Sequence, residues 1–230
     1  MLERVDHVAV GAADLEATLR FYRDGLRLAV TRDGIVDGRR EVRMPVGGSA
    51  VVLRDAGVDR GIEALAFDAD VAQPERPDRE LNLGVQLVLL PRPNEGAGPA
   101  APSNVRCIDH VVISSGDSGR CAAHFEERYG LEIKRKMIRP GTSAQLAFAK
   151  LGDVILEFAG PPEAKEGPLE AKFWGMVYAV DDIQAAIASV RAAGFEANEP
   201  KPAVQPTAVI ASVRAPTGGV PTAIIQYNAR

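Results

Sequence analysis

The sequence has few cysteines, few aromatic residues and no long apolar stretch. Its 230 residues include 2 cysteines and 1 tryptophan, and aromatic residues make up 5%. Cys107 and Cys121 show neither a CxxC motif nor the spacing of a disulfide framework, so we expect two reduced thiols in a cytoplasmic protein. The chain contains no uninterrupted apolar run of membrane-spanning length, and its first residues lack the apolar core of a signal peptide. We therefore expect neither a membrane span nor secretion.

An excess of positive charge is also missing. The formal net charge is -4, apolar residues make up 46% of the chain and charged residues 25%. Proteins that bind nucleic acid usually carry a basic surface, so this composition argues against a nucleic-acid partner. The composition is ordinary for a globular protein that buries an apolar core.

The most informative feature that is present is an internal repeat. Val5–Val10 reads VDHVAV and Ile108–Ile113 reads IDHVVI, and the two histidines are 103 positions apart (110 minus 7). At the same offset, Val51–Gly57 falls on Val154–Gly160. Such a repeat predicts a duplicated structural unit. Each unit places a histidine on its first strand and a variable residue on its last strand.

The predicted fold class is α+β, with two related domains. A stretch rich in proline and glycine, Pro91–Asn104, predicts a linker at 93–104 between domains at 1–92 and 105–230. Apolar periodicity and glycine stops predict a βαβββ unit in each domain. The expected helices are 13–25 and 118–129, and the expected strands include 26–30, 39–46, 49–54, 131–134, 143–150 and 153–159.

A second unit follows in the C-terminal half, and a shortened one in the N-terminal half. Strands are predicted at 173–180, 208–214 and 220–227, with a helix that Asp182 caps and that ends before Gly194. In the N-terminal half, strands at 61–69 and 84–90 match the first and last of these. Only 14 positions separate Asp70 from Gly84, against 38 between Asp181 and Gly219. These positions are too few for a helix and a return strand, so the second N-terminal module is predicted to be truncated.

Several motifs together resemble the vicinal oxygen chelate superfamily, which includes glyoxalase I, bleomycin-resistance proteins and extradiol dioxygenases. They are the histidine phrase, FYRDGL at 21–26, VDDIQAA at 180–186 and APTGG at 215–219. The resemblance implies paired βαβββ modules that form curved mixed sheets around a cup. It also implies a small-molecule ligand, one divalent metal (Fe, Mn, Ni or Zn) and a homodimer.

In that superfamily, metal ligands come from the first and last strands of the modules. In the C-terminal domain these positions fall on His110, Glu157, Gly175 and Ala223, of which only the first two can bind a metal. A slip of one residue would offer Met176 or Thr222, which are poor ligands for hard ions. The corresponding N-terminal positions are His7, Arg54, Ala64 and Val88. The ligand set is therefore incomplete in both domains.

Two hypotheses remain open on the sequence alone. In the first, His110 and Glu157 are catalytic, either as metal ligands or as an acid–base pair for lyase, isomerase or ring-cleaving dioxygenase chemistry. In the alternative, the protein binds or sequesters a small molecule without metal, as bleomycin-resistance proteins do. Under either hypothesis, the bound small molecule would contact an aromatic wall formed by Trp174 and Tyr178.

Two histidines remain outside this pair. His7 and Arg54 could form an anion site in the N-terminal domain, because a guanidinium pairs with both oxygens of a carboxylate. Nothing in the sequence pairs with His124 at metal spacing, so it is expected on the surface.

Overall fold

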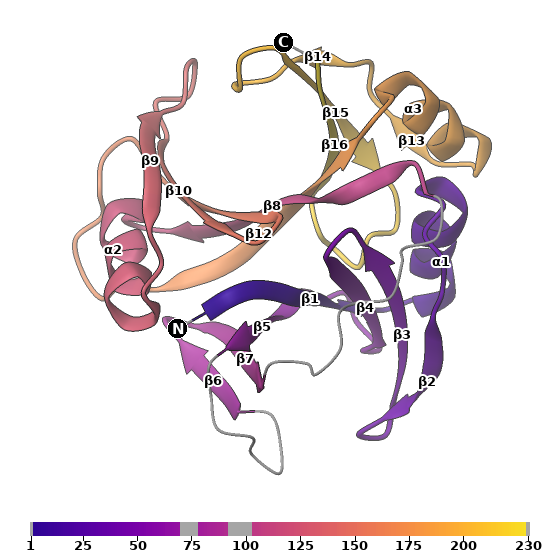
Figure 1. The fold of residues 1–230 in the computed structure, drawn as a ribbon, viewed down its shortest axis with the longest axis horizontal. Helices are drawn as coiled ribbons and strands as arrows, with labels where there is room; N and C mark the ends of the chain where they lie inside the picture. Colours follow the sequence, from indigo (N-terminus) through magenta and orange to yellow (C-terminus); the bar gives the residue numbers. More distant parts are fainter. Residues whose placement is uncertain (1, 70–77, 92–102, 229–230) are drawn as a thin grey trace.

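Two mixed β-sheets packed against one another form the molecule. The computed structural model describes residues 2–69, 78–91 and 103–228, with a 7-stranded sheet from the N-terminal half and a 9-stranded sheet from the C-terminal half. Figure 1 shows the C-terminal sheet curving around an open cup, with β8 and β12 as its floor and β9–β10 and β15–β16 as its two walls. The α+β class and the curved mixed sheets predicted from the repeat are confirmed.

The N-terminal sheet has the strand order β2-β3-β4-β1-β5-β7-β6. Its elements are β1 (Leu2–Ala12), α1 (Leu15–Arg20), the π-helical turn η1 (Phe21–Gly25), β2 (Arg32–Val36), β3 (Arg39–Val46), β4 (Ser49–Asp55), β5 (Gly61–Ala69), β6 (Asp78–Asn82) and β7 (Val85–Pro91).

The C-terminal sheet has the order β13-β15-β16-β12-β8-β11-β10-β9, with β14 paired to β15. Its elements are β8 (Val105–Ser115), α2 (Ser118–Tyr129), β9 (Ile133–Ile138), β10 (Gln145–Leu151), β11 (Val154–Gly160), β12 (Ala171–Val180), α3 (Ile183–Ala192), β13 (Glu196–Ala197), β14 (Lys201–Pro202), β15 (Ala208–Arg214) and β16 (Thr222–Tyr227).

The two sheets repeat one topology. β1 pairs in parallel with β4 and antiparallel with β5, and β8 makes the same pairings with β11 and β12. The last strand of each half, β7 or β16, then adds in parallel to β5 or β12. The repeated sequence phrases therefore occupy equivalent central strands.

Helix ends are specified locally by aspartate and glycine. The carboxylates of Asp14, Asp117 and Asp182 accept hydrogen bonds at 2.9 to 3.0 Å from backbone N–H groups in the first turns of α1, α2 and α3. Gly130 ends α2 in the left-handed conformation, with φ at 70°. The predicted helix at 118–129 and the cap at Asp182 are confirmed.

The predicted strand at 26–30 was wrong. The backbone there follows a π-helical turn, in which the Leu26 and Leu28 N–H groups donate to carbonyls of η1 at 3.0 Å. Arg27 has a φ of 56°, which no strand residue adopts. Both leucines are buried, but they reach the core from this turn, and β2 begins only at Arg32. In the C-terminal half the corresponding strand begins at Ile133 rather than 131.

A return strand does form in the shortened N-terminal module. β6 pairs antiparallel with β7 along its whole length, from Asn82 opposite Val85 to Asp78 opposite Leu89. The expectation that these positions are too few for a helix and a return strand is therefore corrected for the strand. The helix would fall on residues 70–77, which lie outside the described residues.

One apolar core lies between the sheets and joins the two halves. Strand alternation sends Val8 and Val10 of β1 and Val111 and Ile113 of β8 into it. Aromatic rings from both halves meet there in edge-to-face pairs. The ring centroids of Tyr22 and Tyr178 are 6.2 Å apart, and those of Phe21 and Phe195 are 5.7 Å apart. The opposite faces of both sheets, which carry His7 and His110, are left free of this core.

Tyr178 belongs to this shared core. It is 0% exposed, whereas Trp174 on the same strand is 53% exposed. The sequence analysis assigned both to a ligand pocket, and the structure corrects that assignment for Tyr178. Register shifts along β12, next to Gly175 and after Val177, let the strand send Trp174 and Tyr178 into different surroundings.

We expect the substitution Tyr178→Ala to lower the free energy of unfolding by about 3–5 kcal/mol, because it leaves a cavity where the two halves meet. The matched substitution Trp174→Ala removes a half-exposed ring and should cost about 1 kcal/mol or less. Urea unfolding followed by circular dichroism measures both. Equal losses for the two variants would contradict the assignment of Tyr178 to the core.

Candidate functional site

A β-bulge in the first strand of each half places two consecutive side chains together. In β8, His110 lies opposite Val177 and Ile108 lies opposite Tyr178, so Asp109 is the extra residue between them. In β1 the extra residue is Asp6, before His7. Neighbouring strand residues normally point to opposite faces, and a bulge removes that restriction. The aspartate can therefore bond to the histidine that follows it.

His110 and Glu157 meet at the floor of the C-terminal cup. Nε2 of His110 lies 3.3 Å from Oε2 of Glu157, and the two residues are 6% and 2% exposed. Parallel pairing of β8 with β11 brings them together, because His110 lies opposite Ile155 and Glu157 lies opposite Val112, two positions further on. The sequence analysis paired these two residues, and the structure brings them into contact.

Asp109 fixes the orientation of the His110 ring. Its Oδ2 lies 2.7 Å from Nδ1 of His110 and accepts a second hydrogen bond from the Tyr227 hydroxyl at 3.1 Å. Burial and the negative charge of Asp109 raise the pKa of Tyr227, so its hydroxyl stays a donor. A carboxylate only accepts hydrogen bonds, so Nδ1 of His110 carries a proton and Nε2 faces Glu157.

This arrangement places a ring nitrogen beside a buried carboxylate. With Nδ1 of His110 bound to Asp109, Nε2 lies at ion-pair distance from Oε2 of Glu157. A histidine held against a carboxylate at the floor of a cavity is suited to general acid–base chemistry.

Arg139 completes the site from the turn between β9 and β10. Its Nη2 donates to Oε1 of Glu157 at 3.1 Å, and its backbone N–H closes the turn by donating to the Ala144 carbonyl at 2.8 Å. The guanidinium balances the charge of the buried carboxylate. Arg139 was not predicted, because no sequence pattern near it indicates that an arginine in this turn contacts Glu157 on β11. Asp109 could have been found, because an Asp-His pair opens both repeats.

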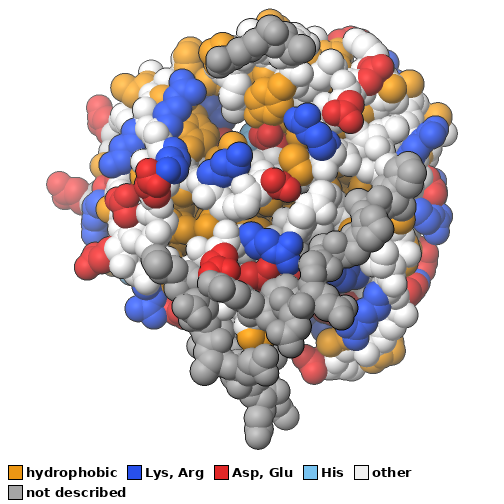
Figure 2. All heavy atoms as spheres, viewed as in Figure 1, with side chains coloured by type: hydrophobic (Ala, Val, Ile, Leu, Met, Phe, Trp, Pro, Cys, Tyr) orange, Lys and Arg blue, Asp and Glu red, His pale blue; other side chains and the backbone are white. Residues whose placement is uncertain are grey.

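The cup contains a cavity of about 820 Å³ above this site. His110, Glu157 and Arg139 line it, with an apolar wall that includes Trp174, Phe148, Met137 and Leu146. Figure 2 shows Lys and Arg side chains together with hydrophobic side chains around the open side of the cup. The cavity therefore offers an apolar body and a polar floor, which is the usual composition of a small-molecule site.

A second hollow, of about 620 Å³, lies beside the start of α2 and is lined by Asp117, Arg120 and Lys165 among others. It contains no residue of the His110 site. We therefore place the candidate functional site in the cup.

The donor set of the cup does not fit a resident divalent metal. Among the described residues, no three His, Cys, Asp or Glu side chains are grouped so that they could hold an ion. A Cβ at Gly175 would lie 2.9 Å from the Pro221 carbonyl oxygen, so that position has no room for a ligand side chain.

The residues next to the expected ligand positions do not complete the set. The Met176 sulfur accepts a hydrogen bond from Tyr178 at 3.4 Å, and the Thr222 hydroxyl donates to the Val220 carbonyl at 2.8 Å. His110 and Glu157 would hold an ion alone, beside the positive charge of Arg139. Two donors are fewer than the three protein ligands of typical catalytic sites.

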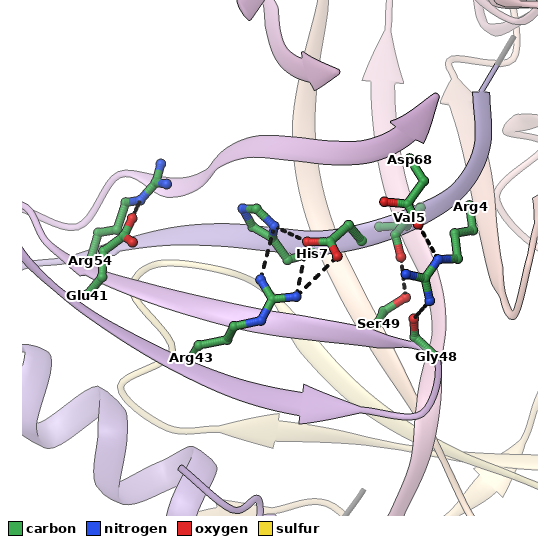
Figure 3. Close-up of polar contacts among 10 residues, drawn as sticks. Arg4, Val5, His7, Glu41, Arg43, Gly48, Ser49, Arg54 and Asp68 are labelled. Carbon is green, nitrogen blue, oxygen red and sulfur yellow. Dashed lines mark hydrogen bonds and ion pairs between the residues drawn. The ribbon is translucent and has the colours of Figure 1, made fainter. Parts of the chain in front are cut away.

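The corresponding face of the N-terminal sheet is occupied by ion pairs (Figure 3). Nδ1 of His7 lies 2.6 Å from Asp6, and Arg43 donates to the same carboxylate at 3.0 Å. Arg54 is paired with Glu41 at another part of the sheet, away from His7. The anion site suggested for His7 and Arg54 is not formed, because the two side chains do not converge and a carboxylate already neutralises Arg54.

His124 is less exposed than the sequence indicated. Its Nε2 lies 2.9 Å from the Asn82 amide oxygen, so the ring links α2 to the end of β6. This contact joins the two halves of the chain and gives His124 a structural role.

Comparison with known proteins places the fold. The sequence profile of the Glyoxalase/Bleomycin resistance protein/Dioxygenase superfamily matches residues 107–220. A variant of 4-hydroxymandelate synthase from Streptomyces coelicolor has a TM-score of 0.69 at 16% identity, covering 100% of this chain and 94% of that one.

Two dioxygenases have similar structures. The 2,3-dioxygenase LapB from Pseudomonas sp. KL28 has a TM-score of 0.69 at 16% identity, over 99% of this chain and 93% of that one. BphC, a halotolerant catechol dioxygenase, reaches 0.70 at 10% identity, over 98% of this chain and 87% of that one. No curated protein matches the sequence. At these identities the structures share the fold.

The Asp6 ion pairs predict a pH dependence of stability. Burial alone would raise the pKa of Asp6, but the hydrogen bond from His7 and the charge of Arg43 outweigh it and lower the pKa from 3.8 to about 2. A carboxyl whose pKa is lowered in the folded state stabilises the protein above its unfolded pKa and loses that contribution as the pH falls towards 2. The substitution Asp6→Asn should therefore flatten the stability profile between about pH 4 and pH 2, as measured by urea unfolding. A profile as steep as that of the unmodified protein would contradict the ion pair.

Proposed function

Because residues 107–220 belong to the Glyoxalase/Bleomycin resistance protein/Dioxygenase superfamily, we propose that the C-terminal cup binds a small, partly apolar molecule and exchanges a proton with it through His110 and Glu157. The protein would then be an enzyme of proton-transfer type. Members of this superfamily bind small molecules, and this chain has a cavity of suitable size in the matched region. The chemistry is assigned to residues of this chain alone.

The contact between His110 and Glu157 is the observation that carries the proposal. Asp109 holds Nδ1 of His110, and Nε2 of His110 lies 3.3 Å from Oε2 of Glu157 at the cavity floor. A ligand C–H or O–H bond placed next to this pair can lose its proton to the basic member and regain it from the acidic one. The low exposure of both residues keeps competing water away.

Metal-assisted chemistry is a weaker proposal for this chain. The superfamily resemblance implies a divalent metal, but among the described residues only His110 and Glu157 could act as ligands. Arg139 already donates a hydrogen bond to one carboxylate oxygen of Glu157. Sequestration of a ligand without chemistry, the alternative from the sequence, needs the same cavity but gives no role to the buried contact between His110 and Glu157. Proton exchange at a bound carbon acid distinguishes proton transfer from sequestration.

Two further properties remain predictions. Within the described part of the chain, no helix is long and apolar enough to cross a membrane, and the cytoplasmic location still rests on the cysteine pattern. The homodimer still rests on the resemblance. Edge strand β6 adds an argument for it, because Leu81 is 72% exposed there and an exposed edge invites pairing.

Hydrogen–deuterium exchange at a neutral aromatic carbon acid tests the proposed chemistry. With phenylacetone as the probe in D₂O, we expect the protein to accelerate exchange of the benzylic protons, followed by NMR. His110→Ala and Glu157→Gln should each reduce the acceleration by about 100-fold or more, while His124→Ala, which alters a histidine outside the cup, should not. The acceleration should survive treatment with a chelator.

Exchange at the uncatalysed rate with the intact protein, although phenylacetone binds, would contradict proton transfer and favour sequestration. Loss of exchange on chelation would contradict the metal-independent assignment instead.

A further inference from the structure

The charges that line the cup are almost all positive. Five cationic side chains and one carboxylate, that of Glu157, line the cavity, whereas the whole chain has a net charge of -4. The cations are Lys134, Arg135, Arg139, Lys150 and Lys201. A positive cavity in a negative protein concentrates its field on the opening and attracts anions there.

Three of these cations have no acidic partner among the residues that the structure describes. Lys134 pairs with Glu132 and Arg139 pairs with Glu157. Within the described ranges, Arg135, Lys150 and Lys201 form no ion pair. Most other arginines of the protein are paired with carboxylates, including Arg43 and Arg54 on the N-terminal sheet. The absence of partners in the cup leaves positive charge available to a ligand.

Sheet register places two of the free cations two strands away from His110 and Glu157. Arg135 of β9 lies opposite Phe148 of β10, which lies opposite Glu157 of β11. Lys150 lies opposite Ile155, which lies opposite His110. Each cation is therefore two strands, about 10 Å, from a member of the pair. Lys201 is on β14, across the cavity from these strands (Figure 1).

A donor without an acceptor marks the same wall. Nε of Arg139 is buried and has no hydrogen-bond partner, while Nη2 of the same group is bound to Glu157. The Arg139 side chain as a whole is 40% exposed and lines the cavity, so its guanidinium adds positive charge to this wall. Phe148 and the exposed ring of Trp174 add apolar surface to the same cavity.

We propose that the ligand of the cup is an amphipathic oxyanion, a carboxylate or phosphate group attached to a small apolar or aromatic body. The oxyanion lies on the β9–β10 wall, where Arg135, Lys150 and the guanidinium of Arg139 bind it. The body packs against Phe148 and Trp174 and presents its reactive bond to His110 and Glu157. This inference rests on the proposed function, because it names the ligand class of the same cup.

Matched probes that differ only in charge test the ligand class. Calorimetric titrations of the full chain would compare phenylacetate and benzylphosphonate with the neutral phenylacetamide. We expect both oxyanions, or the one whose head group fits, to bind at least about tenfold more tightly than the amide, with a preference that weakens as salt is added. The oxyanion that binds with the higher affinity shows whether the head group of the ligand is a carboxylate or resembles a phosphate.

Variants of the wall assign the charge. Arg135→Gln combined with Lys150→Gln should reduce oxyanion affinity by about tenfold or more and leave phenylacetamide affinity unchanged. Lys136→Gln is the matched control, because Lys136 follows Arg135 on β9 but does not line the cavity. It should change neither affinity. Circular dichroism of each variant checks that the fold is retained.

Equal affinity for the amide and both oxyanions, or an oxyanion preference that survives in the double variant, would overturn the inference. If the oxyanion inference fails in this way but phenylacetamide binds and the protein still accelerates proton exchange in phenylacetone, the proposed function stands without the oxyanion inference. Failure of every probe to bind would overturn both, because the cup would then not be a binding site.

Discussion

One extra residue in the first strand of each half sets the geometry of the candidate site. The bulge lets Asp109 hold the His110 ring from the neighbouring position, so the other ring nitrogen points to the strand that closes the unit. Without the bulge, the aspartate would point to the opposite face, and nothing else described in the site would fix which nitrogen of His110 meets Glu157. The orientation of the pair therefore depends on a backbone irregularity.

The two halves share this device and differ in what faces it. In the C-terminal half the closing strand supplies Glu157, and the space above the pair is an open cavity. In the N-terminal half the equivalent position is Arg54, which pairs with Glu41, while Arg43 binds the bulged Asp6. Ion pairs thus saturate one face and leave the other available. The two halves share one backbone arrangement, and a few different side chains leave the open cavity and the histidine–glutamate contact in only one of them.

Most of the fold could be predicted from the periodicity of apolar residues and from the internal sequence repeat. The central strands, the helix at 118–129 and the facing of His110 and Glu157 follow from alternation, caps and a repeat with constant offset. The strand expected at 26–30 failed because Leu26 and Leu28 alternate like strand residues, although they are buried by a π-helical turn whose hydrogen bonds leave no mark in the sequence. Tyr178 was misplaced because register shifts along β12 are invisible to a simple alternation rule.

The remaining site residues depend on contacts between distant segments. Arg139 reaches Glu157 from a turn 18 residues earlier in the chain, and Tyr227 reaches Asp109 over a separation of 118 residues. Such contacts are set by how the sheet curves, which composition and local pattern do not encode. The positive lining of the cup is of the same kind, because its cations come from several strands that only the fold brings together.

The tautomer of His110 is the most direct test of this account. Long-range ¹H–¹⁵N NMR of protein labelled at histidine, assigned with a His110→Ala variant, reports which ring nitrogen carries the proton. The account predicts a proton on Nδ1, retained because Asp109 accepts it, and loss of that signature in Asp109→Asn. A ring protonated on Nε2 alone, with Nδ1 bare, would contradict the bulge-held orientation and the acid–base pair that depends on it.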